Sequence, residues 1–307
     1  MNTGLRITAF AAALAATFGT AYGVGNGADP VFEAAPGHAA PGGAADRPDG
    51  HGGHQDEAAG AAEGGEGGDR GAAGGLQVSE GGYALDLDTP TLTAGARSEI
   101  RFAIKDEHGR KVTAFQREHT KEMHFIIASR DLTEYRHVHP VRGADGTWST
   151  VVRLPDAGGY RAFADFTPAG KGATGRTLGA DLAVAGDARP QPLPPVRGTA
   201  AADGYEVALD GALRAGKPGE LKLTVSRNGR PVTDLQPYLG AYGHLVALRS
   251  GDLAYLHVHP NEGGPGPEVS FTATAPSSGA YRLFLDFRHD GEVRTVAFTV
   301  HAGHAGS

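Results

Sequence analysis

Three histidines recur at one spacing in two stretches of the chain. HFIIASRDLTEYRHVHP runs from His124 to Pro140, and HLVALRSGDLAYLHVHP runs from His244 to Pro260. Both begin with His and end in His-Val-His-Pro, so the pattern repeats at an offset of 120 positions. Neutral imidazoles gathered in threes bind borderline metal ions such as Cu(II) and Zn(II). The spacing therefore predicts a metal site in each repeat, provided that the chain brings the rings together.

An antiparallel hairpin would bring them together in the second repeat. The Gly-Asp dipeptide at 251–252 is a plausible hairpin turn, and counting outward from it pairs His244 with His259. Paired residues share a face of the sheet, and His257 lies two residues from His259 on the same strand, so it points the same way. All three rings then project from one side of the hairpin.

The first repeat has the same length between its histidines. A loop of two or four residues around Asp131 pairs His124 with His139, and His137 joins them on the same face. A loop of odd length would send His124 to the other face. The predicted imidazole ligands are His124, His137, His139, His244, His257 and His259.

Three other side chains are candidate ligands or supports for a ligand. Met123 precedes His124 and carries a thioether, which Cu(I) favours, but Gly243 occupies the matching position of the second repeat. Asp165 and Asp286 lie in the equivalent stretches FADF and FLDF, on strands expected beside those of the leading histidines. Each could supply an oxygen ligand or a hydrogen bond that orients an imidazole.

Not every histidine follows the pattern. His108, His119 and His289 have no counterpart at the offset, and we expect them on the surface. A purely structural role also stays open for the repeated histidines. A His-x-His pair at the end of a strand often satisfies only backbone groups or a carboxylate, and the Pro that follows ends the pairing.

Short β-strands must position these residues. Each repeat contains seven runs rich in Val, Leu, Phe, Thr and Tyr, separated by Gly, Pro, Asn and Asp, with no helical periodicity. This texture predicts a β-sandwich. DAGGY, ending at Tyr160, and SSGAY, ending at Tyr281, match the turn of a tyrosine corner. The expected fold is all-β, with two tandem immunoglobulin-like β-sandwiches.

The segments around the sandwiches differ in composition. Residues 7–24 form an apolar run, so residues 1–25 are expected to be a hydrophobic helix that anchors the chain in a membrane or a cleaved export signal. Either places the remainder outside the cytoplasm. The Gly, Ala and acidic composition of residues 26–76 predicts a disordered spacer. The sandwiches are expected at 77–186 and 200–301, with a Pro-rich linker at 187–199 and a tail at 302–307.

Composition excludes several functional classes. The chain has no Cys, so any metal must be held by nitrogen, oxygen or thioether. The spacer holds nine acidic and two basic residues, which leaves 35 − 9 = 26 acidic and 28 − 2 = 26 basic residues elsewhere. This balance does not favour a nucleic-acid partner. We also find no nucleophile elbow, acid–base pair or phosphate loop, and therefore do not expect an enzyme.

The motif resembles a known kind of domain. A His that enters a strand, a short turn and a closing His-x-His-Pro are similar to the extracytoplasmic immunoglobulin-like domains of the YtkA-like and copper-resistance CopC-like kind. The likeness covers Tyr83 to Gly186 and Tyr205 to His301. It implies copper or heavy-metal handling by the six repeated histidines. With only two methionines, the chain departs from the methionine-rich Cu(I) sites of copper carriers.

Two functions from different classes follow. The first is an extracytoplasmic protein that binds a metal ion, copper or alternatively zinc, and buffers it or hands it to an envelope metal transporter or sensor. The second is an envelope interaction or adhesion-type protein whose tandem immunoglobulin-like domains present binding surfaces, while the histidines are structural.

Overall fold

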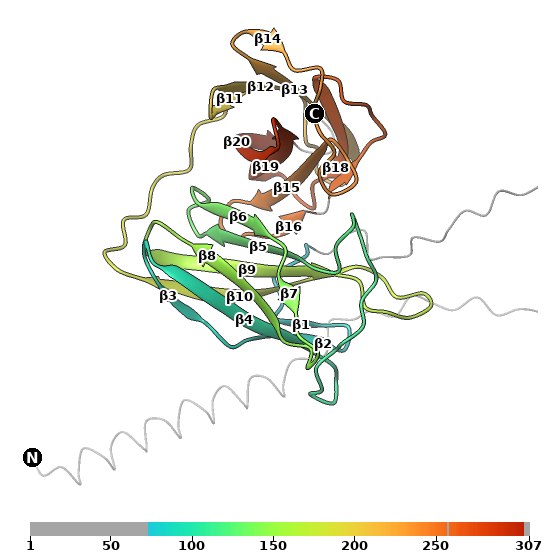
Figure 1. Ribbon diagram of the computed structural model, residues 1–307. Coiled ribbons are helices and arrows are strands. Elements are labelled where there is room, and N and C mark those ends of the chain that lie inside the picture. Colours follow the sequence, from blue (N-terminus) through green and yellow to red (C-terminus); the bar gives the residue numbers. More distant parts are fainter. Residues whose placement is uncertain (1–72, 257, 304–307) are drawn as a thin grey trace, which may run out of the picture. The chain divides into compact units, whose positions relative to one another are not determined.

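The computed structural model describes residues 73–256 and 258–303, and every regular element within these ranges is a β-strand (Figure 1). Two tandem immunoglobulin-like β-sandwiches follow one another along the chain, which confirms the expected fold class. The expected hydrophobic helix, residues 26–72 of the spacer, His257 and residues 304–307 of the tail lie outside the described residues. Within the described ranges no helix is long and apolar enough to cross a membrane.

The first sandwich consists of two five-stranded sheets, with strand orders β1-β2-β4-β8-β7 and β3-β10-β9-β5-β6. Its strands are β1 (Ser79–Glu80), β2 (Tyr83–Leu87), β3 (Thr91–Thr93), β4 (Arg97–Lys105), β5 (His124–Ser129), β6 (Tyr135–Val138), β7 (Val141–Arg142), β8 (Trp148–Arg153), β9 (Gly158–Phe166) and β10 (Arg176–Ala185).

The second sandwich has one sheet in the order β11-β12-β13-β18-β17, with β14 beside β13, and another in the order β16-β15-β19-β20. Its strands are β11 (Thr199–Ala202), β12 (Tyr205–Gly211), β13 (Pro218–Arg227), β14 (Arg230–Pro231), β15 (Gly243–Arg249), β16 (Tyr255–Leu256), β17 (Val258–Pro260), β18 (Glu268–Thr274), β19 (Gly279–His289) and β20 (Glu292–Ala302).

Both tyrosine corners are present. The Tyr160 hydroxyl donates a hydrogen bond to the Asp156 carbonyl at 2.8 Å, and the Tyr281 hydroxyl donates to the Ser277 carbonyl at 2.9 Å. Both rings are almost fully buried in their own sandwich core. Plain apolar packing around these rings holds each pair of sheets together in a chain without cysteine.

A third apolar layer joins the two sandwiches. Along β5, Phe125 and Ile127 point into the first core, so the alternate residues Ile126 and Ala128 point to the other face of the sheet. There they pack against the corresponding face of β15 and β19. The layer contains Ile126, Ala128, Leu132, Tyr135 and Phe163 from the first sandwich and Val246, Leu248, Leu253, Tyr255 and Phe284 from the second. Burial of both faces explains why β5 and β15 are continuous apolar runs.

Contacts across this layer are reciprocal. Tyr135 of the first sandwich stacks on Phe284 of the second, with ring centroids 4.1 Å apart. Tyr255 of the second lies 5.8 Å from Phe163 of the first. Equivalent positions of the two repeats therefore exchange partners, as they do in an isologous dimer interface.

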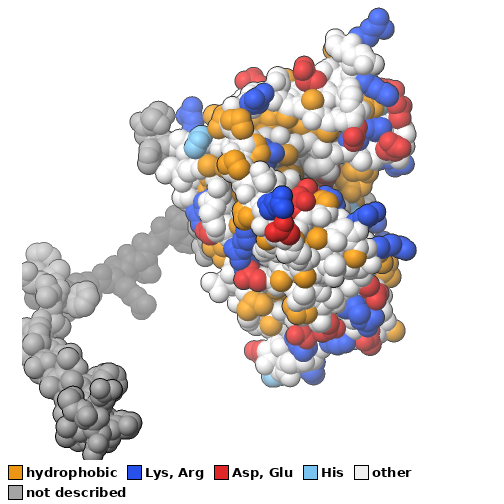
Figure 2. Space-filling model, turned by 90° about the vertical axis from the view of Figure 1, so that its left-hand side faces the viewer, with side chains coloured by type: hydrophobic (Ala, Val, Ile, Leu, Met, Phe, Trp, Pro, Cys, Tyr) orange, Lys and Arg blue, Asp and Glu red, His pale blue; other side chains and the backbone are white. Residues whose placement is uncertain are grey.

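The outer surface mixes charges of both signs. Figure 2 shows Lys and Arg side chains interspersed with Asp and Glu on the face in view. Most ion pairs between these groups are exposed, and such pairs contribute little to stability. The histidines at the buried layer therefore say more about function than the surface charges do.

Candidate metal centre

The first triad assembles as predicted. Strands β5 and β6 pair Phe125 with Val138 and Ile126 with His137, and one step further outward this register brings His124 opposite His139. The ring centroid of His124 lies 5.3 Å from that of His137 and 5.1 Å from that of His139. The even-length loop thus places the three imidazoles on the sheet face that meets the second sandwich.

The second hairpin begins in the predicted register but does not keep it. The Arg249 amide donates to the Ala254 carbonyl at 2.9 Å, and Leu248 pairs with Tyr255. After Leu256 the chain crosses to the other sheet, where β17 pairs with β18 and His259 stands opposite Thr272. The prediction that His259 pairs with His244 is therefore wrong.

The crossing has a physical reason. Val258 is buried in the second core and pairs with Ala273, so the sheet switch stabilises the sandwich through apolar packing. His257 lies outside the described residues, and so does the side chain of His259. A separate triad in the second repeat consequently stays a prediction for these two residues.

His244 joins the first triad instead. Its ring centroid lies 5.3 Å from that of His124, with the two planes 9° apart, and 4.7 Å from that of His137. His124, His137 and His244 each offer one ring nitrogen, and the three atoms all lie within 4.8 Å of one another. With His139, 4.8 Å from His137 between centroids, they form what we call the histidine cluster. Both sandwiches contribute to this one site.

Two nitrogens of the cluster are buried without a hydrogen-bond partner among the described residues, namely His139 Nε2 and His244 Nδ1. Native proteins rarely bury a polar atom in this way, because the desolvation cost is not offset. A cation bound to the deprotonated ring nitrogens would offset this desolvation cost. The two nitrogens are therefore candidate donors to a metal ion.

The tautomers of His124 and His137 also indicate a cation between the rings. His137 Nδ1 lies 2.9 Å from Asp286 Oδ2, and His124 Nε2 lies 3.2 Å from the Glu118 carbonyl, so each of these nitrogens is assigned a proton. In two neutral rings, the remaining lone pairs of His124 Nδ1 and His137 Nε2 then face each other at 3.1 Å. Only a cation, a proton or a metal ion, can stabilise that arrangement.

Burial keeps most of these rings neutral. Desolvation, followed by the neighbouring His137 ring, lowers the pKa of His124 to about 4. Desolvation, followed by the neighbouring rings of His137 and His124, lowers the pKa of His139 to about 3. Burial also lowers the pKa of His244 well below its usual value. Neutral imidazole is the form that coordinates metal ions, so ligation at neutral pH requires no deprotonation of these three groups.

The predicted supporting residues separate into different roles. Asp286 accepts from His137 across the two sandwiches and from Thr295 Oγ1 at 2.5 Å, as expected for a carboxylate that orients a ligand. Asp165 stands opposite His124 in the β5–β9 register and accepts from Thr177 Oγ1 at 3.0 Å. Met123 is 1% exposed and packs in the first core, so the structure does not bring it to the cluster.

Of the histidines expected on the surface, His289 is buried and His119 is only partly exposed. His119 is half-buried in the turn before β5, and its ring centroid lies 5.7 Å from that of His244. His289 is 8% exposed and lies between the Tyr205 hydroxyl, at 2.7 Å, and Asp234, at 3.0 Å. Because neither residue repeats, the offset pattern gave no sign of their burial. His108 is exposed as expected.

Comparison with known families supports the duplication. Residues 77–178 and 200–304 each match the family described as Domain of unknown function (DUF8832). The chain belongs to the DUF8832 family. Each DUF8832 segment contains one copy of the histidine pattern. No curated protein sequence matches the chain, and the resemblance to the YtkA-like and CopC-like domains stays a prediction.

Several solved structures are similar to this DUF8832 protein in part. The Escherichia coli adhesin FdeC is 16% identical over 74% of this chain and 65% of its own, with a TM-score of 0.24. The Yersinia pseudotuberculosis adhesin InvE is 12% identical over 76% of this chain and 61% of its own, also with a TM-score of 0.24. A DUF4426 family protein from Pseudomonas aeruginosa is 11% identical over 34% of this chain and 94% of its own, with a TM-score of 0.25.

Proposed function

We propose that this protein binds one transition-metal ion outside the cytoplasm, in the histidine cluster shared by its two sandwiches, and buffers the ion or hands it on. One observation carries the proposal. Ring nitrogens from both sandwiches converge in a buried site, and their lone pairs face one another or have no partner among the described residues. A bound cation would satisfy all of them.

The chemistry of the donors favours copper or zinc. Imidazole nitrogen is a ligand of intermediate softness that suits Cu(II) and Zn(II), whereas Cu(I) prefers thioether and thiolate. The chain has no Cys, and Met123 is enclosed in the first core. His124, His137 and His244 would hold the ion, with His139 as a fourth donor and Asp286 orienting His137. An envelope transporter or sensor that exchanges the ion would be the partner.

A second candidate is an envelope interaction protein in which the cluster is a structural fastener. The buried pair of His137 and Asp286 links the sandwiches, with side chains only 2% and 3% exposed. A proton between His124 and His137 would satisfy their facing lone pairs without metal. The apolar layer and the His137–Asp286 pair would then hold the two domains together without a metal ion.

Titration of the purified full chain with Cu(II) and Zn(II) distinguishes these candidates. We expect one tight equivalent per chain, lost in both His124→Ala and His244→Ala although these residues belong to different sandwiches. The chain has 14 histidines, so His108→Ala, an exposed position, is the control for weak background binding. Binding that is equal in all four proteins would support the fastener instead.

A further inference from the structure

The histidine cluster is enclosed, and this raises the question of how an ion would reach it. His124 is 5% exposed, the side chain of His137 is 2% exposed, and the unpartnered nitrogens of His139 and His244 are buried. Asp286 and the apolar layer with Tyr135 and Phe284 cover other sides. An ion therefore needs a defined route from solvent.

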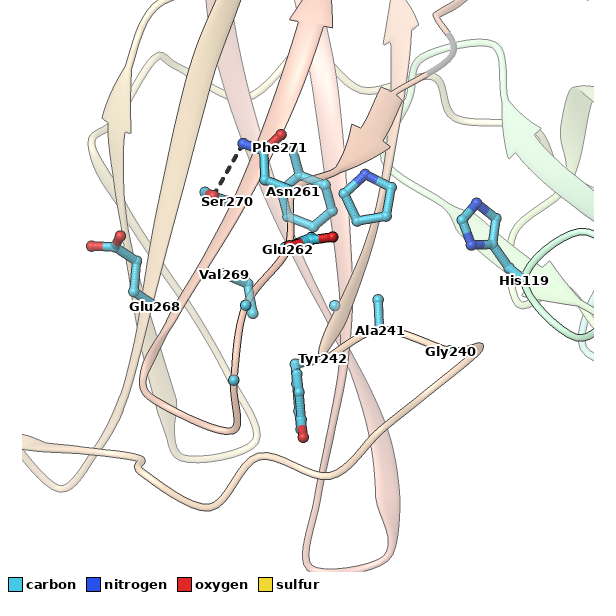
Figure 3. A pocket seen from close by; sticks show the side chains of 14 residues that line it. His119, Gly240, Ala241, Tyr242, Asn261, Glu262, Glu268, Val269, Ser270 and Phe271 are labelled. Carbon is cyan, nitrogen blue, oxygen red and sulfur yellow. Dashed lines mark hydrogen bonds between the residues drawn. The ribbon is translucent and has the colours of Figure 1, made fainter. Parts of the chain in front are cut away.

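A cleft of about 470 Å³ opens beside the cluster. Its wall is formed by the turn at 240–243, residues 260–264 and β18 of the second sandwich, and by one residue of the first sandwich, His119. Figure 3 shows His119 entering from a separate segment, while the other labelled residues belong to the second sandwich.

His119 connects this cleft to the cluster. Its ring centroid lies 5.7 Å from that of His244 and 6.1 Å from that of His124. It is not one of the three residues whose nitrogens lie within 4.8 Å of one another. His119 is thus a neighbour of the cluster that also lines an open cavity.

The backbone holds His119 in this place under strain. His119 and Thr120 have φ angles of 46° and 71°, and left-handed backbone is especially unfavourable for a β-branched residue such as Thr. Glu118 and Lys121 close the turn with two backbone hydrogen bonds of 2.8 and 2.9 Å. The Glu118 carbonyl also accepts from His124 Nε2, which ties the turn to the cluster.

The second repeat builds the same turn without a histidine. Tyr238 and Ala241 close it, and Leu239 and Gly240 occupy the two left-handed positions. A Cβ at Gly240 would lie 4.0 Å from the Thr120 methyl group, so the two turns approach each other at the rim of the cleft. Only one of the two equivalent turns therefore places an imidazole beside the cluster.

The cleft also has the charge to attract a cation. Glu262 and Glu268 line it, and neither Lys nor Arg does. Glu268 forms an ion pair with Lys222 at 3.5 Å, whereas Glu262 is exposed and has no ion pair within the ranges that the structure describes. An acidic cleft raises the local concentration of cations and their rate of association.

From these observations we infer that His119 is an access ligand, which receives a metal ion in the acidic cleft and passes it to the histidine cluster; the inference rests on the proposed function. The transfer is a ligand exchange without redox change. The coordinate bond from His119 breaks as bonds from His244 and His124 form, and the ion's water molecules leave through the cleft.

The test compares the full chain with His119→Asn in stopped-flow exchange of Zn(II) and Cu(II), using a chromophoric chelator to follow uptake and release. Asn is favoured in such a turn and removes the imidazole, so the fold is kept. We expect both rates to fall by the same factor, about tenfold or more, with Kd unchanged, since Kd is the ratio of the rates. Glu262→Gln should slow uptake alone, and less so at high salt.

Several outcomes would overturn the inference. Rates equal to those of the wild-type protein would show that His119 is not on the route. A weaker Kd caused only by faster release would make His119 a ligand of the bound state. In either case the wild-type protein still binds metal, and the proposed function stands. If the wild-type protein takes up neither ion, the proposed function fails, and the access role of His119 fails with it.

Discussion

His124 Nδ1 and His137 Nε2 face each other at 3.1 Å inside the histidine cluster. Their outer nitrogens are engaged by Glu118 and Asp286, so the inner lone pairs cannot turn away without losing those hydrogen bonds. A cation between them therefore relieves repulsion as well as gaining ligands.

The burial of neutral histidines predicts a pH-dependent stability. An unfolded histidine has a pKa near 6.5, whereas burial lowers the pKa of His124 to about 4 and that of His139 to about 3. Below pH 6.5 the unfolded chain therefore binds more protons, and the metal-free protein loses stability as the pH falls. Between pH 7.5 and 5.5, we expect His124 alone to lower the free energy of unfolding by about 1 kcal/mol.

Urea denaturation at these two pH values checks the prediction. His124→Phe should reduce the difference, because it removes a titrating group from the site, whereas His108→Ala should leave it unchanged. A stability that is flat over this interval, or that rises toward pH 5.5, would contradict the assignment of neutral buried rings.

Asp286 supports the cluster from the second sandwich. Its carboxylate accepts from His137 Nδ1 and fixes the tautomer that leaves Nε2 free. Asp286→Asn should weaken metal binding by roughly 10- to 100-fold, as is typical when such a supporting carboxylate is lost. Chelator competition measures the change, with Asp203→Asn in an exposed turn as the charge-matched control. Equal affinities in both variants would argue that Asp286 does not orient the ligand.

Two hairpins and two turns position these residues, and their geometry could be predicted only in part. The length of the loop after β5 was enough to predict that His124, His137 and His139 share a face, because strand registers change faces in single steps. The tyrosine corners were visible for a similar reason: their signal is local.

The crossing of the second hairpin between sheets had no local signal. Arg136-His137-Val138 and Leu256-His257-Val258 are nearly the same sequence, yet β6 continues to Val138 while β16 ends at Leu256. The difference lies in tertiary packing, since Val258 is buried in the second core, whereas the equivalent Val138 is only partly buried against the first core. The shared site was equally hidden, because a self-comparison of one chain does not show which faces of two domains meet.

At the level of turns, Thr120 near the site is a β-branched residue held in the left-handed region. A left-handed conformation costs an L-residue about 1–2 kcal/mol, and the equivalent residue of the second repeat is Gly240. Thr120→Gly relieves this strain, but glycine also increases the conformational entropy of the unfolded chain. The net result should be a rise in the free energy of unfolding of up to about 1 kcal/mol. Chemical denaturation measures it, and Gly240→Thr should show the opposite sign. A clear loss of stability in Thr120→Gly would contradict the strain.

The two sandwiches are copies of one domain, and they pack against each other as two subunits of a dimer would. Tyr135 on Phe284 and Tyr255 near Phe163 are the two halves of this reciprocal contact. The interface and the histidine cluster share the same sheet faces. Ligand binding and domain association should consequently be coupled, because an ion held by both sandwiches stabilises their contact.

Phe284→Ala tests this coupling. Phe284 is 2% exposed, and truncating a buried Phe typically costs about 3–5 kcal/mol. We expect calorimetry to show loss of stability and separation of one unfolding transition into two, together with weaker metal binding although no ligand is changed. Val141→Ala, at a 74% exposed position, is the control. Unchanged metal affinity in a destabilised Phe284→Ala protein would show that the interface does not support the site.

Anomalous diffraction from crystals of the protein grown with Zn(II), recorded at the zinc absorption edge, would locate the bound ion. For a site shared by both sandwiches we expect one strong peak among His124, His137 and His244, at the usual Zn–N distance of about 2.0–2.1 Å from their ring nitrogens. Separate peaks within each sandwich, or zinc bound only at histidines outside the cluster, would contradict it.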